Sequence, residues 1–208
     1  MAVNARTILR PGLLQGTSLL LAGAPTPLAA VVERAFCKLG ARVFTCLPDG
    51  EDEATIDSAV AAVLAEAGSI DMLVVAGGGL FHDGASTALR ACLDSAWNVT
   101  RAVVNTAFLP AGRGGRIVYL APALDAGAHA LAARAGLENL ARTLSVEWAR
   151  HNINVIAIAA GGGAGGVPTP DRPGPDNPAE ELAALAAYLA SPAGAYFSGC
   201  LLDLDTTR

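Results

Sequence analysis

Three polar residues of this chain could support proton-transfer chemistry: Asn98, His129 and Arg134. A histidine titrates near neutral pH, so His129 is the candidate acid–base group, and Arg134 carries a permanent positive charge nearby in the sequence. However, His129 lies in a stretch rich in alanine and glycine, where an exposed histidine without a catalytic role is the ordinary expectation. Asn98 falls in a long helical stretch, where its side chain can simply bond a neighbouring carbonyl.

A glycine-rich run, Gly161–Gly166, is the most conspicuous candidate for a phosphate cradle. It follows an apolar run, as phosphate loops do, but prolines come next instead of the start of a helix: Pro168, Pro170, Pro173 and Pro175. A phosphate loop needs the amide groups of a helix N-terminus behind it. We therefore interpret Gly161–Pro178 as an irregular link.

The cysteines and the charge balance exclude several other functions. The four cysteines are scattered, without a CxxC pair or zinc-ligand spacing, which predicts buried thiols in a reducing compartment: Cys37, Cys46, Cys92 and Cys200. Fourteen basic against 19 acidic residues, without a basic cluster, argue against nucleic-acid binding. Because no apolar run approaches a membrane span and residues 1–16 lack one altogether, we expect a cytoplasmic location.

Apolar runs alternate with helical stripes along the chain. The runs predict buried strands at Ser18–Ala22, Val43–Cys46, Met72–Ala76, Ile117–Leu120, Val155–Ala159 and Leu201–Leu204. Apolar residues at helical spacing predict helices at 28–39, Ile56–Ala67, Thr87–Leu109, Arg134–Arg150 and, starting at Pro178, through Leu189. Gly40 stands where a left-handed helix cap is expected.

This order of elements predicts the fold class. Strands that alternate with helices and are apolar without interruption are typical of a parallel sheet covered on both faces. We expect an α/β fold with a Rossmann-like doubly wound parallel sheet. The chain divides into an N-terminal extension, residues 1–16, and a single domain, residues 17–208.

Several segments resemble one family. Residues 134–161 (RAGLENLARTLSVEWARHNINVIAIAAG) resemble the long helix and following strand of short-chain dehydrogenases/reductases, and residues 179–205 resemble their last helix and strand. Residues 70–78 (IDMLVVAGG) and 115–120 (GRIVYL) fall where that family has its fourth and fifth strands. The resemblance implies a nicotinamide-dependent oxidoreductase fold. It also implies that the helix and strand beside the adenine, and the substrate lid, are reduced here.

The cofactor loop departs from the family pattern. Gly23 matches the first glycine of the loop, but Pro27 and Ala29 stand at the second and third. Pro27 has no amide to donate and Ala29 adds a methyl group, so a plain strand-to-helix turn is the favoured interpretation. Leu47 stands where the family has an acid for the ribose, and Asp49 is better explained as a turn residue. We expect no cofactor-binding residue and no bound NAD.

The catalytic positions depart further. By the resemblance, the family's Tyr-x-x-x-Lys pair falls on Ala130 and Arg134, its serine falls near Pro122, and its asparagine is retained as Asn98. Lys38 is the chain's only lysine, and none of the tyrosines is followed by lysine four residues later: Tyr119, Tyr188 and Tyr196. The planar guanidinium of Arg134 is a poor substitute for a compact ammonium. We expect no catalytic and no metal-binding residue.

These losses, with intact apolar helices, are similar to the silent subunits of some hetero-oligomeric short-chain dehydrogenases. One such complex is the heterotetrameric dehydrogenase of anaerobic toluene degradation, which acts on a hydroxybenzylsuccinyl-CoA in the benzylsuccinate pathway. The resemblance implies a non-catalytic subunit beside an active homologous subunit that carries the NAD. The alternatives are an active oxidoreductase with a displaced site at Asn98, His129 and Arg134, or a ligand-sensing module.

The helix at Arg134–Arg150 is the element expected to serve assembly. Its apolar stripe is expected to cover the sheet: Leu137, Leu140, Ala141, Leu144 and Trp148. Its other side, by the resemblance, is expected to face a partner helix: Ala133, Gly136, Thr143 and Glu147. A surface of this kind left uncovered usually signals a missing partner.

Overall fold

The computed structural model describes residues 9–46, 52–81, 87–159 and 178–204. Six parallel strands form one sheet in the order β2-β1-β3-β4-β5-β6. They are β1 (Ser18–Gly23), β2 (Arg42–Cys46), β3 (Met72–Ala76), β4 (Gly115–Ala121), β5 (Ile153–Ala159) and β6 (Leu201–Asp203). The expected Rossmann-like parallel sheet is confirmed.

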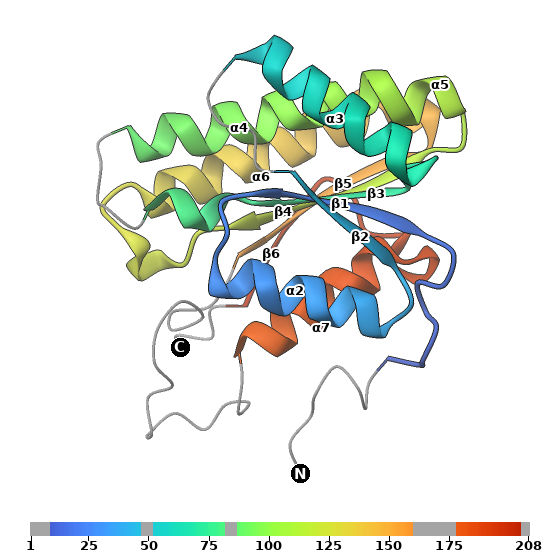
Figure 1. The fold of residues 1–208 in the computed structure, drawn as a ribbon. Coiled ribbons are helices and arrows are strands. Elements are labelled where there is room, and N and C mark those ends of the chain that lie inside the picture. The colour runs from blue at the N-terminus through green and yellow to red at the C-terminus, as the bar shows by residue number, and fades with distance from the viewer. Residues whose placement is uncertain (1–8, 47–51, 82–86, 160–177, 205–208) are drawn as a thin grey trace.

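Helices cover both faces of this sheet (Figure 1). One face carries α2 (Pro27–Lys38) and α7 (Pro178–Ala190), which pack against each other. The other face carries α3 (Glu53–Ala67), α4 (Ala88–Val103) and α6 (Ala130–Glu147). Single turns of 3-10 helix add η1 (Gly77–Phe81), η3 (Leu124–Ala126), η4 (Ala149–His151) and η5 (Pro192–Gly194).

The order of the strands fixes where a ligand would bind in this fold. Strand β1 lies between β2 and β3, so that Leu20 is opposite Phe44 on one side and Leu73 on the other. The direction in which the chain adds strands reverses between β1 and β3. In doubly wound sheets, ligands bind at the carboxyl ends of the strands beside such a reversal.

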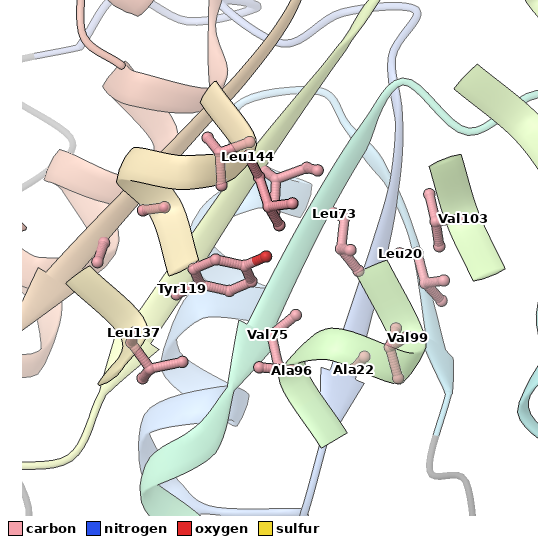
Figure 2. Packing of buried hydrophobic residues seen from close by; sticks show 14 of the residues in the cluster. Leu20, Ala22, Leu73, Val75, Ala96, Val99, Val103, Tyr119, Leu137 and Leu144 are labelled. Carbon is pink, nitrogen blue, oxygen red and sulfur yellow. The ribbon is translucent and has the colours of Figure 1, made fainter. Parts of the chain in front are cut away.

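Apolar side chains fill the space between the sheet and the helices on each face. In Figure 2, Leu73 and Val75 of β3 lie near Ala96 and Val99 of α4, and all four belong to one cluster of buried residues. The four central strands, β1, β3, β4 and β5, are buried on both faces, because a second cluster of buried residues fills the α2 and α7 side. This explains why the strands read as continuous apolar runs in the sequence.

The end of α2 follows its sequence signal. Gly40 has a φ of 98° and its amide donates to the carbonyl of Cys37 at 3.0 Å, while the amide of Ala41 donates to Phe36 at 3.1 Å. This pair of bonds is a Schellman motif, which needs a left-handed residue at the Gly40 position. The expected glycine cap is confirmed.

Two helices differ from the sequence prediction. The uninterrupted helix expected over Thr87–Leu109 is instead α4, followed by a π-helical segment, η2 (Val104–Phe108), and the short α5 (Leu109–Ala111). Pro110 has no amide to donate, and π turns are a common way of absorbing such an interruption. Helix α3 begins at Glu53 rather than Ile56, because Asp52 accepts the Thr55 amide at 2.9 Å and caps it.

Helix α6 covers the sheet as predicted, but its other side was partly misassigned. Leu137 and Leu144 are buried in the core beneath it. Ala133, which was expected to face a partner chain, is fully buried within this chain. A Cβ atom built on Gly136 would lie 2.7 Å from Leu93 Cδ2, so Gly136 makes room for α4 of the same chain. The close helix approach is therefore internal at these two residues.

The stretch before β1 also contacts the domain. Leu14 is fully buried among the residues on the α2 side, and its amide donates to the carbonyl of Leu39 at 2.9 Å. Among the residues that the structure describes, no helix is both long and apolar enough to cross a membrane. Within the same ranges, no group of three His, Cys, Asp or Glu side chains could hold a metal ion.

Candidate functional site

The carboxyl ends of β1 and β3 meet at the place where this fold binds ligands. Gly23 ends β1 with a φ of 124°, and a Cβ atom at this position would lie 2.6 Å from the carbonyl oxygen of Ala76. Both the backbone conformation and the close approach of the two strands therefore require glycine. Gly23 has a structural reason to be glycine whether or not a ligand is bound.

The N-terminus of α2 has few amide groups left for an anion. Pro27 carries no amide hydrogen, the Ala29 amide donates to Thr26 Oγ1 at 3.0 Å, and the Ala30 amide donates to the Thr26 carbonyl at 3.1 Å. This leaves Leu28 as the donor of the first turn. An anion site at a helix N-terminus depends on several such amides pointing at the ligand. The Thr26 cap thus satisfies the helix from within the chain.

The positions that the resemblance assigns to the catalytic pair, Ala130 and Arg134, lie in the first two turns of α6. Ala130 is fully buried, and Arg134, one turn later, is 2% exposed. The Arg134 guanidinium forms a short ion pair with Asp203 at the end of β6, whose side chain is half exposed. Its Nη1 atom is buried and makes no hydrogen bond. The guanidinium of Arg134 is thus held at the last strand by its ion pair with Asp203.

The remaining candidates from the sequence are not joined to Arg134. His129 precedes α6 and is exposed, and its side chain makes no capping hydrogen bond. Asn98 is buried in α4. Among the described residues, no hydrogen bond or ion pair links any two of these three side chains. In the described part of the chain, the three residues of the displaced site that the sequence left open are thus not in contact through polar groups.

The tyrosines are also placed away from proton-transfer chemistry. Tyr119 in β4 is fully buried, and its hydroxyl lies 2.9 Å from the hydroxyl of Thr100 in α4. Figure 2 shows its ring between the side chains of Leu144 and Leu137, both from α6. Burial raises the pKa of Tyr119 far above its ordinary value, although the Thr100 hydrogen bond opposes this change. This phenol stays protonated and has no access to a ligand.

Three of the four cysteine thiols have raised pKa values. Burial raises the pKa of Cys92 to about 12 and also raises the pKa of Cys46. The pKa of Cys37 is raised first by burial and then by the charge of Glu33. Because the thiolate is the reactive form, thiols with raised pKa values are inert at neutral pH. All four cysteines are free thiols, but only Cys46 and Cys92 are buried. The prediction of buried thiols is therefore wrong for Cys37, which is exposed, and Cys200 is only partly buried.

Comparison with known proteins decides the family. A short-chain dehydrogenase family model described as Enoyl-(Acyl carrier protein) reductase matches residues 10–169, which is more than half of the chain. The chain belongs to the short-chain dehydrogenase/reductase family. The resemblance stated from the sequence is therefore confirmed at the level of the family.

One curated relative in this family is the peroxisomal 2,4-dienoyl-CoA reductase of Rattus norvegicus, which is 30% identical over 191 residues. The match covers 77% of this chain but only 65% of the relative. The match thus spans about two thirds of the length of this curated relative.

Solved structures in the family share the fold. A hydroxysteroid dehydrogenase from Escherichia coli superposes with a TM-score of 0.78 at 20% identity, covering 95% of this chain and 99% of that one. A citronellol catabolism dehydrogenase from Pseudomonas aeruginosa PAO1 has a TM-score of 0.74 at 24% identity, covering 96% and 98%. At these identities, the likeness concerns the fold.

Catalysis by a short-chain dehydrogenase requires a tyrosine phenol beside a lysine ammonium. Arg134 stands at the family's lysine position by the sequence resemblance, and its guanidinium is occupied by Asp203. Ala130, at the tyrosine position, is fully buried, and Pro122, near the serine position, is also buried. Asn98 keeps its place in α4. None of these residues gives this chain a phenol and an ammonium side by side.

Sequence reasoning missed the partner of Arg134. Asp203 lies 69 positions further along the chain, and only the pairing of β6 with β5 brings it to α6. The signal that could have indicated it is an acid inside an otherwise apolar last strand, Leu201-Leu202-Asp203.

Leu47, Asp49 and the Gly161–Gly166 run lie outside the described residues. In the described part of the chain, β2 forms the edge of the sheet beside β1.

Proposed function

We propose that this chain is a non-catalytic subunit of a hetero-oligomeric short-chain dehydrogenase, in which it stabilises an active homologous subunit. The observation that carries the proposal is the α6 site: alanine stands at the tyrosine position, and the arginine at the lysine position is buried in an ion pair with Asp203. A short-chain dehydrogenase needs a positive charge beside a phenol to lower the pKa of that phenol. Here the charge of Arg134 is instead paired with Asp203 at the end of β6.

The proposal includes the absence of a bound nicotinamide cofactor in this chain. In its support, the first turn of α2 has lost one amide to Pro27 and has another satisfied by the Thr26 side chain. Each charge-assisted hydrogen bond that is lost costs about 1.5–3 kcal/mol, and about 4 kcal/mol separates micromolar from millimolar binding. The active partner subunit would carry the NAD.

The partner is proposed to be a homologous active dehydrogenase, with two copies of each chain, located in the cytoplasm. A heterotetramer of the kind that acts on hydroxyacyl-CoA in anaerobic toluene degradation is one example of such a complex. The 30% identity to a reductase whose name specifies a CoA ester agrees with a complex that acts on an acyl-CoA. The fold, with its buried apolar strands and helices, is intact enough to serve as a scaffold.

The alternative is an active oxidoreductase with a displaced site, which that same identity favours. A single set of measurements separates the two. The chain is expressed alone and together with a short-chain dehydrogenase encoded beside it, and masses are compared by light scattering. We expect a complex of both chains, and calorimetric titration of the isolated chain with NAD and NADP is expected to give no dissociation constant below the millimolar range. Separate peaks on co-expression, or micromolar nucleotide binding, would reject the proposal.

A further inference from the structure

Strand β2 is an edge of the sheet, and one side of its backbone is left open. Among the described strands, only β1 pairs with β2. The amide of Arg42 points toward β1 and donates to the carbonyl of Thr17 at 2.9 Å. Because successive residues of a strand direct their amides and carbonyls to opposite sides, those of Val43 and Thr45 point away from β1. An open row of this kind is a template for pairing with another strand, and we call it the β2 edge.

The charged side chain of β2 does not block this edge. The guanidinium of Arg42 donates to the carbonyl of Ala67 at 3.0 Å and lies over the ring of Phe44, 5.1 Å from the ring centroid. Both contacts hold it on the face of the sheet that α3 covers. Arg42 and Thr45 are exposed, and Val43 and Phe44 are half-buried, so the strand is accessible from solvent.

The β2 edge is self-complementary in the antiparallel direction. With a two-fold axis at Phe44, Val43 of each copy stands opposite Thr45 of the other, and these two residues exchange amide-to-carbonyl hydrogen bonds. The two Phe44 rings then lie side by side on the α3 face, which is a favourable cross-strand pair. Isologous interfaces require this reciprocity, in which residue i contacts residue j and j contacts i.

Helix α3 borders the same edge on one face of the sheet. It packs on β2 and on α4, and its Asp57 forms an ion pair with Arg101 of α4 at 2.9 Å. The side of α3 that is turned away from α4 carries four residues within about 60° of the helix circumference. They are Thr55, Ala59, Ala62 and Glu66, which we call the α3 flank. Three of them are exposed and Ala59 is half-buried.

The α3 flank and the β2 edge fit one two-fold axis. The hydrogen bond from Arg42 to Ala67 places the last turn of α3 beside the first residue of β2. Because the two elements run in opposite directions across the sheet, Phe44 in the middle of β2 is level with the middle of α3. An axis at Phe44 therefore brings Ala59 of one copy against Ala62 of the other. Small side chains at this point let the two helices approach closely.

Opposite charges meet across this axis. The last turn of α3 in one copy lies beside the first turn of α3 in the other. Glu66 thus faces the N-terminal end of a helix, where the helix dipole favours an acid. Arg42, at the amino end of β2, comes level with Asp52, which caps α3 of the second copy. This complementarity favours the antiparallel arrangement of the two copies.

We propose that the β2 edge and the α3 flank form the docking face for a second copy of this chain, which continues the sheet across a two-fold axis at Phe44. Stable interfaces bury ~1,200–2,000 Å² in total, which a strand of five residues does not supply alone, so the α3 flank is an essential part of this face. The inference goes beyond the proposed subunit role, because it concerns two identical chains and holds whether or not the site is catalytically active.

The main test compares the same substitution at two neighbouring exposed positions of α3 in the isolated full-length chain. Ala62→Glu places a carboxylate on the α3 flank, close to its copy across the axis, whereas the side chain of Ala61→Glu points away from the sheet. Both variants change the net charge and the helix propensity equally. Masses are measured by light scattering over a range of concentrations. We expect the unmodified chain and Ala61→Glu to have twice the 20.9 kDa of one chain, and Ala62→Glu to raise the dimer dissociation constant at least tenfold.

A second test reports the axis directly. With Cys37→Ser removing the exposed native thiol, Phe44→Cys is expected to form an intermolecular disulfide under mild oxidation, because residues directly opposite each other have Cβ atoms ~4.5–5.5 Å apart. Ala61→Cys in the same background is expected to remain a monomer on a non-reducing gel. A monomeric unmodified chain, an unchanged Ala62→Glu dimer, or cross-linking no better at 44 than at 61 would overturn the inference. None of these results bears on nucleotide binding, which tests the proposed function.

Discussion

At the scale of single residues, the Arg134–Asp203 pair gives a definite prediction about stability. Arg134 is buried while Asp203 is half exposed, so the two partners do not contribute equally. Asp203→Asn leaves a buried guanidinium without its counter-ion, and we expect it to lower the free energy of unfolding by ~1–3 kcal/mol. Arg134→Met keeps the apolar volume of the stem and leaves a carboxylate that water can solvate, so it is expected to cost less.

Urea unfolding of both variants and of the double variant measures these costs. The double variant is expected to be more stable than the sum of the single losses predicts, because it removes the buried charge together with its partner. If Arg134→Met costs more than Asp203→Asn, then the packing of the stem matters more than its charge. The idea that α6 holds β6 by an ion pair would then be wrong.

Restoring the family's catalytic pair is expected to fail. Ala130 is fully buried, so Ala130→Tyr combined with Arg134→Lys inserts a ring into a filled core and costs ~1–3 kcal/mol in unfolding free energy. It also leaves the cofactor loop and the serine position unchanged, and catalytic groups that act as a unit are far from additive. We expect no NAD- or NADP-dependent oxidation of secondary alcohols by this variant.

The assay is run on protein whose fold is checked by circular dichroism. Arg134→Lys alone is assayed beside it, so that the test survives if the double variant does not fold. Detectable cofactor-dependent turnover by either variant would count against a non-catalytic role. It would show that catalysis at this site does not require the family's cofactor loop and serine.

At the scale of elements, Gly23 shows how a family signature can persist for structural reasons. We expect Gly23→Ala to destabilise the isolated chain by ~1–3 kcal/mol, because the new methyl group meets the backbone of β3 at 2.6 Å in a strained conformation. Gly68→Ala is the matched control, with a φ of 78° and no atom within 4 Å of the added Cβ. It carries the conformational strain without the clash. Equal losses in thermal unfolding would mean that the strand contact is unimportant.

The elements also show how far the sequence determines this fold. Strands such as Met72–Ala76 were predicted to the residue, because a strand buried on both faces must be apolar throughout. The π segment after α4 was missed, since apolar spacing continues through it and only Pro110 hints at the change. Ala133 was misassigned to an interface because small residues serve close helix contacts within a chain as well as between chains. The long-range contact of Arg134 with Asp203 was missed because an acid at the end of an apolar strand does not indicate which distant residue it pairs with.

At the scale of the whole molecule, the proposed complex would contain two kinds of chain with unequal sites. Since α2 of this chain has few free amides at its N-terminus and α6 has no tyrosine–lysine pair, only the partner would bind NAD. We expect calorimetric titration of the purified complex to give about 0.5 NAD per chain, with the isolated partner giving about one per chain. This ratio follows from two copies of each subunit and does not depend on which substrate the complex uses.

The same titration separates the proposed arrangement from its rivals. If each chain of the complex bound one NAD, this chain would have a competent site that forms on assembly, and the non-catalytic reading would be wrong. The Arg134→Met variant provides the control, because it alters the α6 site of this chain and leaves the partner untouched. We expect the complex with Arg134→Met to bind NAD in the same ratio and with the same affinity. A loss of binding in that complex would show instead that Arg134 takes part in holding the cofactor.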